Sequence, residues 1–253
     1  MLSQLKELQF IVPKTGIIGK YKVLRTMGTG SFGCVLAAEH LDVCFAIKVI
    51  HKSPQFYELG LSEIELIQQL NHPNIVRYYR HFVHKEHLCI VFELLGKNLY
   101  EVMKLRQFKP FSSTVVATIG LQLVSALNYL KSLHIMHCDL KPENICFLEE
   151  YTTNIKIIDF GSSSIEPQYY YIQSRYYRAP EVILRTDLQG PEMDMFSFGA
   201  ILAEMHIGRP IAAGKNEKDQ FNQWIYLLGP PPDHLLKFTT DLVLLTLGYG
   251  SLC

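Results

Sequence analysis

Two short segments of the chain carry acidic, basic and amide side chains close together. The first is HCDLKPEN, residues 137–144, and the second contains Asp159, Phe160 and Gly161. An aspartate carboxylate can take up a proton, and magnesium prefers carboxylate and other oxygen ligands. One Asp-Phe-Gly tripeptide carries little information, so the order of further motifs must decide what these residues do.

The stretch GTGSFG, residues 28–33, is a candidate binding loop. Its G-x-G-x-x-G spacing fits a dinucleotide-binding turn or an ordinary glycine-rich hairpin, and the first of these needs a helix directly after the loop. Here CVLAAEH and VCFAIKVI follow, which predict strands. We therefore expect a β-hairpin whose backbone amides can approach phosphates, because glycine side chains do not obstruct them.

Lys48 ends the apolar run of residues 45–47. A lysine there usually just extends its amine to solvent, but its place one hairpin after the glycines favours phosphate binding. It then needs an acidic partner, and SEIELIQQLN offers Glu63 and Glu65. Spacing from the helix end favours Glu63, with Glu65 as the alternative.

The elements that must position these residues fall into two parts. After a leader at residues 1–20, residues 21–95 are rich in predicted strands and contain one helix at 62–70, which Pro73 terminates. Residues 96–253 look mostly helical, with a long, largely buried helix at 114–133 and another at 193–205. Ligand sites favour junctions between such parts.

Composition sets limits on function. Twenty-four basic and 24 acidic residues give a formal net charge of zero, which offers no global reason to bind nucleic acid or an anionic membrane. No apolar run reaches about 18 residues, so no membrane-spanning helix is expected. The six cysteines lack paired spacing, which indicates reduced, mostly buried thiols in a cytoplasmic or nuclear protein.

A histidine-rich segment, RHFVHKEHLCIVF, raises the question of a metal site at His81, His84, His87 and Cys89. Strand alternation would send neighbouring histidines to different faces, whereas zinc needs four converging ligands. A β-hairpin with HKEH as its polar turn is the better interpretation.

The motifs occur in a telling order: Asp139 and Asn144, then Asp159-Phe160-Gly161, then Ala-Pro-Glu at 179–181. From about Tyr21 to about Leu228 the chain resembles a eukaryotic protein kinase. QYYYIQSRYYRAPEVIL and HCDLKPEN narrow the resemblance to the CMGC group and the dual-specificity tyrosine-regulated kinases. The homeodomain-interacting kinases are the nearest alternative. The resemblance implies an α+β, bilobal fold with an antiparallel β-sheet N-lobe and a mostly helical C-lobe.

The resemblance also implies an ATP- and Mg²⁺-dependent enzyme that phosphorylates serine or threonine of protein substrates. Asp139 would be the base, Lys141 would steady the phosphate, and Asn144 and Asp159 would bind magnesium. Lys48 and Glu63 would complete the catalytic set. The implied nucleotide-binding residues, beside Lys48, are Met27, Gly28, Gly30, Ser31, Gly33, Val35, Ala46, Phe92, Glu93, Leu95, Cys146 and Ile158.

Cys138 stands where many kinases have an arginine that pairs with a phosphorylated activation segment. In the resembled family a cysteine is usual there, and a phosphotyrosine binds arginines further along. Here these would be Tyr171, autophosphorylated, with Arg175 and Arg178, which suit a phosphate in charge and planar geometry. The alternative is that YYYIQSRYYR is simply an aromatic loop packed on its lobe.

Substrate preferences are implied as well. Arg178 would shape the pocket for the substrate residue after the acceptor so that it tolerates proline. Glu143 and Glu217 match acidic positions that attract a substrate arginine upstream of the acceptor. Two departures stand out: Phe196 replaces the usual tryptophan, and the chain after about residue 232 does not resemble the rest of a C-lobe. It lacks an arginine to pair with Glu181. A truncated lobe would expose apolar surface for a partner, and a nucleotide-binding scaffold without turnover is the alternative function.

Overall fold

The computed structural model describes residues 16–30, 32–166, 172–186 and 189–237 of the chain. It divides into two compact units, residues 1–96 and 97–253. Each unit is described by itself.

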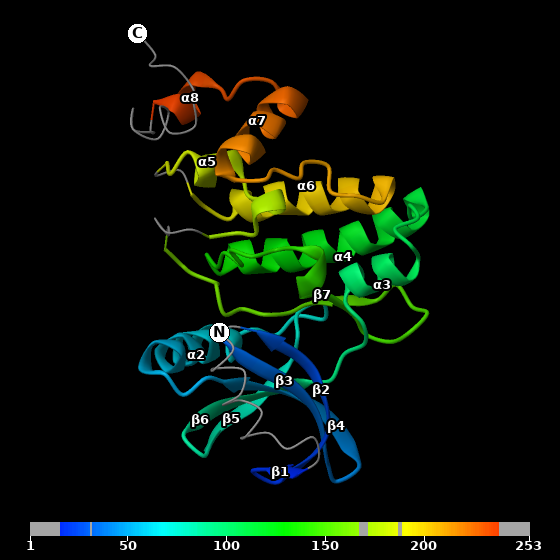
Figure 1. Cartoon of the computed structure of the whole chain (residues 1–253), viewed down its shortest axis with the longest axis vertical. Helices are drawn as coiled ribbons and strands as arrows, with labels where there is room; N and C mark the ends of the chain where they lie inside the picture. The colour runs from blue at the N-terminus through cyan, green and yellow to red at the C-terminus, as the bar shows by residue number, and fades with distance from the viewer. Residues whose placement is uncertain (1–15, 31, 167–171, 187–188, 238–253) are drawn as a thin grey trace. The chain divides into compact units, whose positions relative to one another are not determined.

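The first unit is an antiparallel sheet with one helix, as predicted (Figure 1). It has six strands, and the first of them lies within the segment 1–20 that was expected to be a leader. The strands lie in the order β1-β2-β3-β4-β6-β5. Successive residues of a strand point to opposite faces, so alternate residues such as Leu36, Ile47 and Val91 form a continuous core. The strands are β1 (Gly16–Ile18), β2 (Tyr21–Gly30), β3 (Gly33–His40), β4 (Val43–Ile50), β5 (Tyr78–His84) and β6 (His87–Glu93).

Two-residue turns at 41–42 and 85–86 set the register of the β3–β4 and β5–β6 hairpins. All four residues have φ between 47° and 68°, the handedness that matches strand twist. His84 and His87 were expected in the second turn, but they are the last paired residues of the two strands. In the described part of the chain no three His, Cys, Asp or Glu residues form a metal-binding group.

Helix α2 (Pro54–Ile67) begins well before the predicted residue 62. Ser53 caps it by accepting a hydrogen bond from the Phe56 amide, and Pro54 occupies the first turn, where a missing N–H costs nothing. The helix buries Glu63, Ile64 and Ile67. It contacts β4 and β6 and so lies against the sheet.

The second unit is mostly helical, as predicted. Helices α4 and α6 run side by side (Figure 1), and Phe196 of α6 packs edge-on against Trp224 of α7 at 4.8 Å between ring centroids. Its elements are α3 (Leu99–Leu105), α4 (Ser113–Ser132), η1 (Pro142–Asn144), β7 (Ile145–Phe147), β8 (Ile155–Ile157), η2 (Arg175–Tyr177), α5 (Pro180–Ile183), α6 (Glu192–Ile207), α7 (Glu217–Leu228) and α8 (Asp233–Leu236).

Helix α4 is less buried than predicted. Leu123 is fully buried, whereas Leu121 is 74% exposed. By length and a mean hydropathy of 1.3, α4 would suffice to cross a membrane, which the sequence analysis did not anticipate. It contacts α6 and β8, and the Gln122 side chain accepts the Ile155 amide of β8 at 3.0 Å. The helix is therefore built into the second unit.

Of the five cysteines in the described residues, four are buried free thiols, as predicted, and Cys44 is exposed; Cys253 lies outside the described residues. Burial raises the pKa of the Cys34 thiol to about 11 and that of the Cys146 thiol to about 12. Both thiols are therefore protonated and unreactive at neutral pH.

Candidate active site

The glycine-rich loop is the turn of the β2–β3 hairpin, as the flanking strands predicted. Ser31 lies outside the described residues. Gly33 has a φ of 147°, and a β-carbon there would lie 1.9 Å from the Val49 carbonyl oxygen. Only glycine allows this approach, so the loop backbone packs directly on β4.

Several predicted nucleotide-contact residues share one face of the sheet. Val35 pairs with Lys48, and Ala46 pairs with Phe92; cross-strand partners project to the same side. Their roles, and those of the remaining residues, stay predictions. The remaining residues are Met27 in β2, Glu93 and Leu95 at and after the end of β6, and, in the second unit, Cys146 in β7 and Ile158 after β8.

Lys48 forms an ion pair with Glu63, and the Lys48 amine lies 2.8 and 2.7 Å from the two carboxylate oxygens. Glu63 is only 2% exposed at its side chain, whereas Glu65 is exposed. The geometry thus selects Glu63 of the two candidates. Removing one partner of a buried pair leaves an uncompensated charge, which costs about 3–5 kcal/mol.

In the second unit, Asp139 lies in a dense hydrogen-bond network. Its carboxylate accepts from the Lys141 amine at 2.6 Å and from the Ser174 hydroxyl at 2.7 Å. Lys141 also donates to Ser174 at 3.2 Å, and the Asn144 amide donates to the Asp139 backbone oxygen at 2.9 Å. The carboxylate is therefore fixed in orientation and paired with a cation.

A buried carboxylate holds the backbone of the loop that contains Asp139. Asp194 of α6 accepts the backbone amides of His137 at 2.6 Å and Cys138 at 3.1 Å. Burial raises the pKa of the Asp194 carboxyl, and the two amide hydrogen bonds act in the opposite direction. The His137 ring lies within hydrogen-bonding distance of the Ile158 carbonyl and packs on Phe160, which connects the loop to the Asp-Phe-Gly segment.

Cys138 has a positive φ of 64° and is fully buried. Its side chain packs with Met136, Ala179, Val182 and Met193. Burial raises the pKa of its thiol, so it stays neutral. Where the resemblance to protein kinases in general leads one to expect an arginine, this chain places an apolar contact with the Ala-Pro-Glu segment.

Asn144 and Asp159 have the chemistry that a magnesium ion requires. The Ile158 amide donates to the Asn144 carbonyl at 3.0 Å, which brings Asp159 beside Asn144. Asn144 uses its amide nitrogen within the loop, so its side-chain oxygen is the atom suited to a cation. One or two protein oxygens are usual for magnesium, which keeps waters and binds substrate phosphates.

Both predicted phosphate-binding arginines are tied to the second unit, while Tyr171 lies outside the described residues. Arg178 is 1% exposed and donates to the carbonyls of Ile172 and Gln173, and to Glu217 at 3.0 Å. Arg175 donates to the carbonyls of residues 214 and 215. Its Nε atom is buried without a hydrogen-bond partner.

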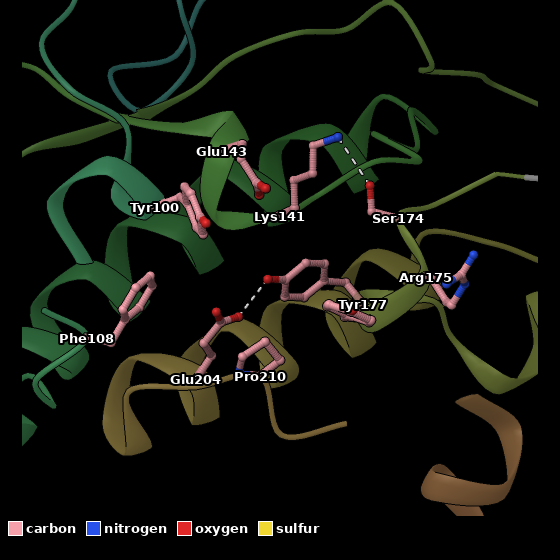
Figure 2. A pocket seen from close by; sticks show the side chains of 10 residues that line it. Tyr100, Phe108, Lys141, Glu143, Ser174, Arg175, Tyr177, Glu204 and Pro210 are labelled. Atoms are coloured by element: carbon pink, nitrogen blue, oxygen red, sulfur yellow. Dashed lines mark hydrogen bonds between the residues drawn. The ribbon is translucent and has the colours of Figure 1, made fainter. Parts of the chain in front are cut away.

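A cavity of about 500 Å³ in the second unit lies next to the loop of residues 137–144, here called the catalytic loop. Figure 2 shows Tyr177 reaching Glu204, to which its hydroxyl donates at 2.6 Å. Burial raises the pKa of the Glu204 carboxyl. Glu143 lines the cavity, whereas Glu217 does not, so these two predicted substrate residues do not share one pocket. The lining residues are Tyr100, Phe108, Lys141, Glu143, Ser174, Arg175, Tyr176, Tyr177, Glu204 and Pro210.

Ser174 and Glu204 were not among the predicted site residues. Ser174 lies within the YIQSR motif, but its contact with Asp139 joins positions 35 residues apart. Glu204 lies in a helix that the sequence assigned only to the core. Neither contact has a local sequence signal.

Comparisons with known proteins agree with this geometry. The protein kinase domain family model matches residues 21–229. The chain is 42% identical over 229 residues to the serine/threonine-protein kinase ppk15 of Schizosaccharomyces pombe, covering 86% of this chain and 43% of the relative. It is 40% identical to the DYRK-family kinase pom1 of the same organism and to the dual specificity protein kinase YAK1 of Saccharomyces cerevisiae. Each match covers 86% of this chain, with 21% and 28% of the relative. The chain thus spans less than half the length of these three relatives.

Proposed function

The chain belongs to the protein kinase family, and from that premise we propose that it transfers the γ-phosphate of ATP to serine or threonine hydroxyls of proteins. We propose further that it is a DYRK-like kinase of the CMGC group, which its similarity to DYRK-family and YAK1 kinases supports. The relatives' names describe serine/threonine and dual-specificity protein kinases.

The observation that carries the proposal is the Asp139 carboxylate held by Lys141 and Ser174. A general base must be oriented toward the hydroxyl whose proton it accepts. Lys141 lies 2.6 Å from this carboxylate, so the same amine is positioned to offset charge on the transferring phosphoryl group. Phosphoryl transfer depends almost entirely on such positioning and electrostatic stabilisation.

Two further groups serve the nucleotide. Lys48, fixed by Glu63, would bind its phosphates beneath the glycine-rich loop. Asn144 and Asp159 would hold magnesium, which neutralises phosphate charge when bound. This division of roles predicts that chelating divalent metal abolishes turnover.

The test is a phosphotransfer assay on the full chain with ATP, magnesium and a Ser-Pro peptide that contains arginine. Asp139→Asn should lower kcat by about 10²–10⁴-fold while nucleotide still raises the melting temperature. Asp159→Ala should abolish turnover. If the unmodified chain is stabilised by Mg-ATP but never turns over, it is a nucleotide-binding scaffold and the proposal fails.

We also propose autophosphorylation of Tyr171. The support is local: Arg175 and Arg178 follow it closely, and Arg175 has a buried Nε atom without a hydrogen-bond partner. A phosphate would supply a charge-assisted acceptor for Arg175, whereas Arg178 already donates to two carbonyls and to Glu217. Phosphopeptide mapping of active protein should find phosphate on Tyr171 and none in an Asp139→Asn variant. Full activity with unmodified Tyr171 contradicts this proposal.

For the substrate we propose an arginine upstream of the acceptor, bound in the cavity lined by Glu143 and Glu204. A guanidinium fits between carboxylates, and the tyrosine rings that line the cavity suit its planar face. Glu217 is already paired with Arg178 and is less suited to this role. Glu143→Gln should raise KM for an arginine-containing peptide and leave KM for its alanine counterpart unchanged. Equal changes for both peptides would exclude the cavity.

A further inference from the structure

The glycine-rich loop is connected to the start of α2 by contacts that the proposed catalytic machinery does not use. The backbone carbonyl of Phe32 accepts the His51 amide at 2.8 Å. This bond continues the β3–β4 ladder, in which Gly33 pairs with Ile50. The loop is therefore attached to the chain segment that runs from β4 into α2.

The same segment leads to Phe56 through two further bonds. The His51 ring accepts the Ser53 amide at 3.2 Å, and the Ser53 hydroxyl accepts the Phe56 amide at 3.4 Å. Ser53 is the cap of α2. Each of these two hydrogen bonds joins residues two or three positions apart in the sequence. Together they fix the first turn of α2 relative to the end of β4.

An aromatic contact between Phe32 and Phe56 joins the glycine-rich loop directly to α2. Phe32 and Phe56 meet edge-to-face, with ring centroids 5.3 Å apart and planes at 73°. The His51 ring also lies edge-on to Phe56 at 6.0 Å. Phe32 is 52% exposed and does not belong to the core of the sheet. The core therefore does not explain its contact with Phe56.

We infer that Phe56 is a positioning residue for nucleotide binding, which holds the glycine-rich loop through Phe32. The inference rests on the proposed function, because it gives the loop a nucleotide to cover. Phe56 and Glu63 are seven residues apart on α2 and lie on nearly the same side of the helix. Any rotation of α2 that withdraws Glu63 from Lys48 would also carry Phe56 away from the loop.

This arrangement makes a specific energetic prediction. Edge-to-face aromatic pairs contribute modestly beyond their buried area, which corresponds to about a 2- to 10-fold effect on an equilibrium. Phe56→Leu should raise KM for ATP by about that factor with little change in kcat. Phe32→Leu should have the same effect, and the double variant should be no worse than either single variant, because the two rings act through one contact.

The experiment combines nucleotide kinetics with hydrogen exchange on the full chain without nucleotide. Phe56→Leu should speed amide exchange in the β2–β3 hairpin, and Phe56→Tyr should retain the unmodified rate. Tyr79→Leu is the matched control: it removes an edge-to-face pair in the same unit, with Phe45 at 5.4 Å, and should leave loop exchange unchanged.

The two readouts separate the inference from the proposed function. If neither the unmodified chain nor any variant turns over ATP, the proposed function fails. Hydrogen exchange alone then still decides whether Phe56 holds the glycine-rich loop. Additive effects of the two leucine variants, or loop exchange unaffected by Phe56→Leu, overturn the inference. Faster exchange after Tyr79→Leu would reduce the effect to general loosening of the sheet and overturn it equally.

Discussion

At the scale of single residues, both ion pairs and hydrogen bonds from neutral groups fix the charged side chains of the site. The Ser174 hydroxyl donates to the Asp139 carboxylate, and the backbone amides of His137 and Cys138 donate to the Asp194 carboxylate, which holds the loop that carries Asp139. The sequence predicted Asp139 and Lys141 from their motif, and helix spacing favoured Glu63. It did not predict Ser174, because a contact between distant segments exists only once the activation segment has folded against the loop.

Ser174 should matter for turnover more than for binding. Ser174→Ala removes a hydrogen bond to a charged carboxylate, an interaction of about 1.5–3 kcal/mol, so kcat should fall about 10- to 100-fold. Ser174→Thr keeps the hydroxyl on an extended backbone and should retain most activity. Steady-state kinetics measure both. An alanine variant with unchanged kcat would show that Lys141 alone orients Asp139.

At the scale of elements, the strands and their order of appearance were predictable because alternation and tight turns are local signals. Helix boundaries and burial were less so. The Ser53 cap that starts α2 lies well before the apolar periodicity that predicted the helix at 62–70, and the apolar content of α4 alone does not fix which of its faces is buried. Which residues of α4 are covered depends on where α6 and β8 pack, and that is a tertiary property.

The glycine-rich hairpin offers a matched pair of substitutions. Gly33→Ala would place a methyl group 1.9 Å from the Val49 carbonyl oxygen at a φ of 147°, whereas Gly28 has open space around it. Gly33→Ala should therefore distort the loop and lower both the melting temperature and the affinity for nucleotide. Gly28→Ala should leave the melting temperature nearly unchanged. Calorimetry on both variants checks this, and equal effects would contradict the geometry.

Helix α4 can be tested with two leucines. Leu123→Ala removes fully buried methyl groups and should lower the free energy of unfolding by about 2–5 kcal/mol. Leu121→Ala, at a side chain that is 74% exposed, should change the free energy of unfolding by less than about 0.5 kcal/mol. Denaturant unfolding distinguishes the two. A large effect at Leu121 would mean that its face is covered by something the described residues do not include.

At the scale of the whole molecule, a neutral net charge conceals several buried carboxyls. Burial raises the pKa of Glu181, Asp194 and Glu204, all in the second unit. Glu181 has no basic partner among the described residues, and the charge of Glu192 raises its pKa further.

Stability should therefore depend on pH with a definite sign. A carboxyl whose pKa is raised by folding contributes stability below its unfolded value, 4.5 for Glu181, and this is lost as pH rises through the folded value. Glu181→Gln should thus raise the melting temperature more at about pH 8 than at about pH 5. Melting curves of this variant and of Glu149→Gln, an exposed control, isolate the term. A pH-independent difference would mean that Glu181 is compensated.

The apolar environment of Cys138 has a consequence for how the second unit responds to salt. A loop arginine that binds a phosphate communicates through charge, which salt screens over about 8 Å at physiological ionic strength. Here the buried neutral thiol of Cys138 packs against Ala179 of the Ala-Pro-Glu segment. Gln173 adds a second link, because its backbone amide donates to the Cys138 carbonyl at 2.9 Å and its side chain accepts the Ala179 amide at 2.8 Å. Neither contact weakens as ions accumulate. This link should therefore be as firm in concentrated salt as in dilute buffer.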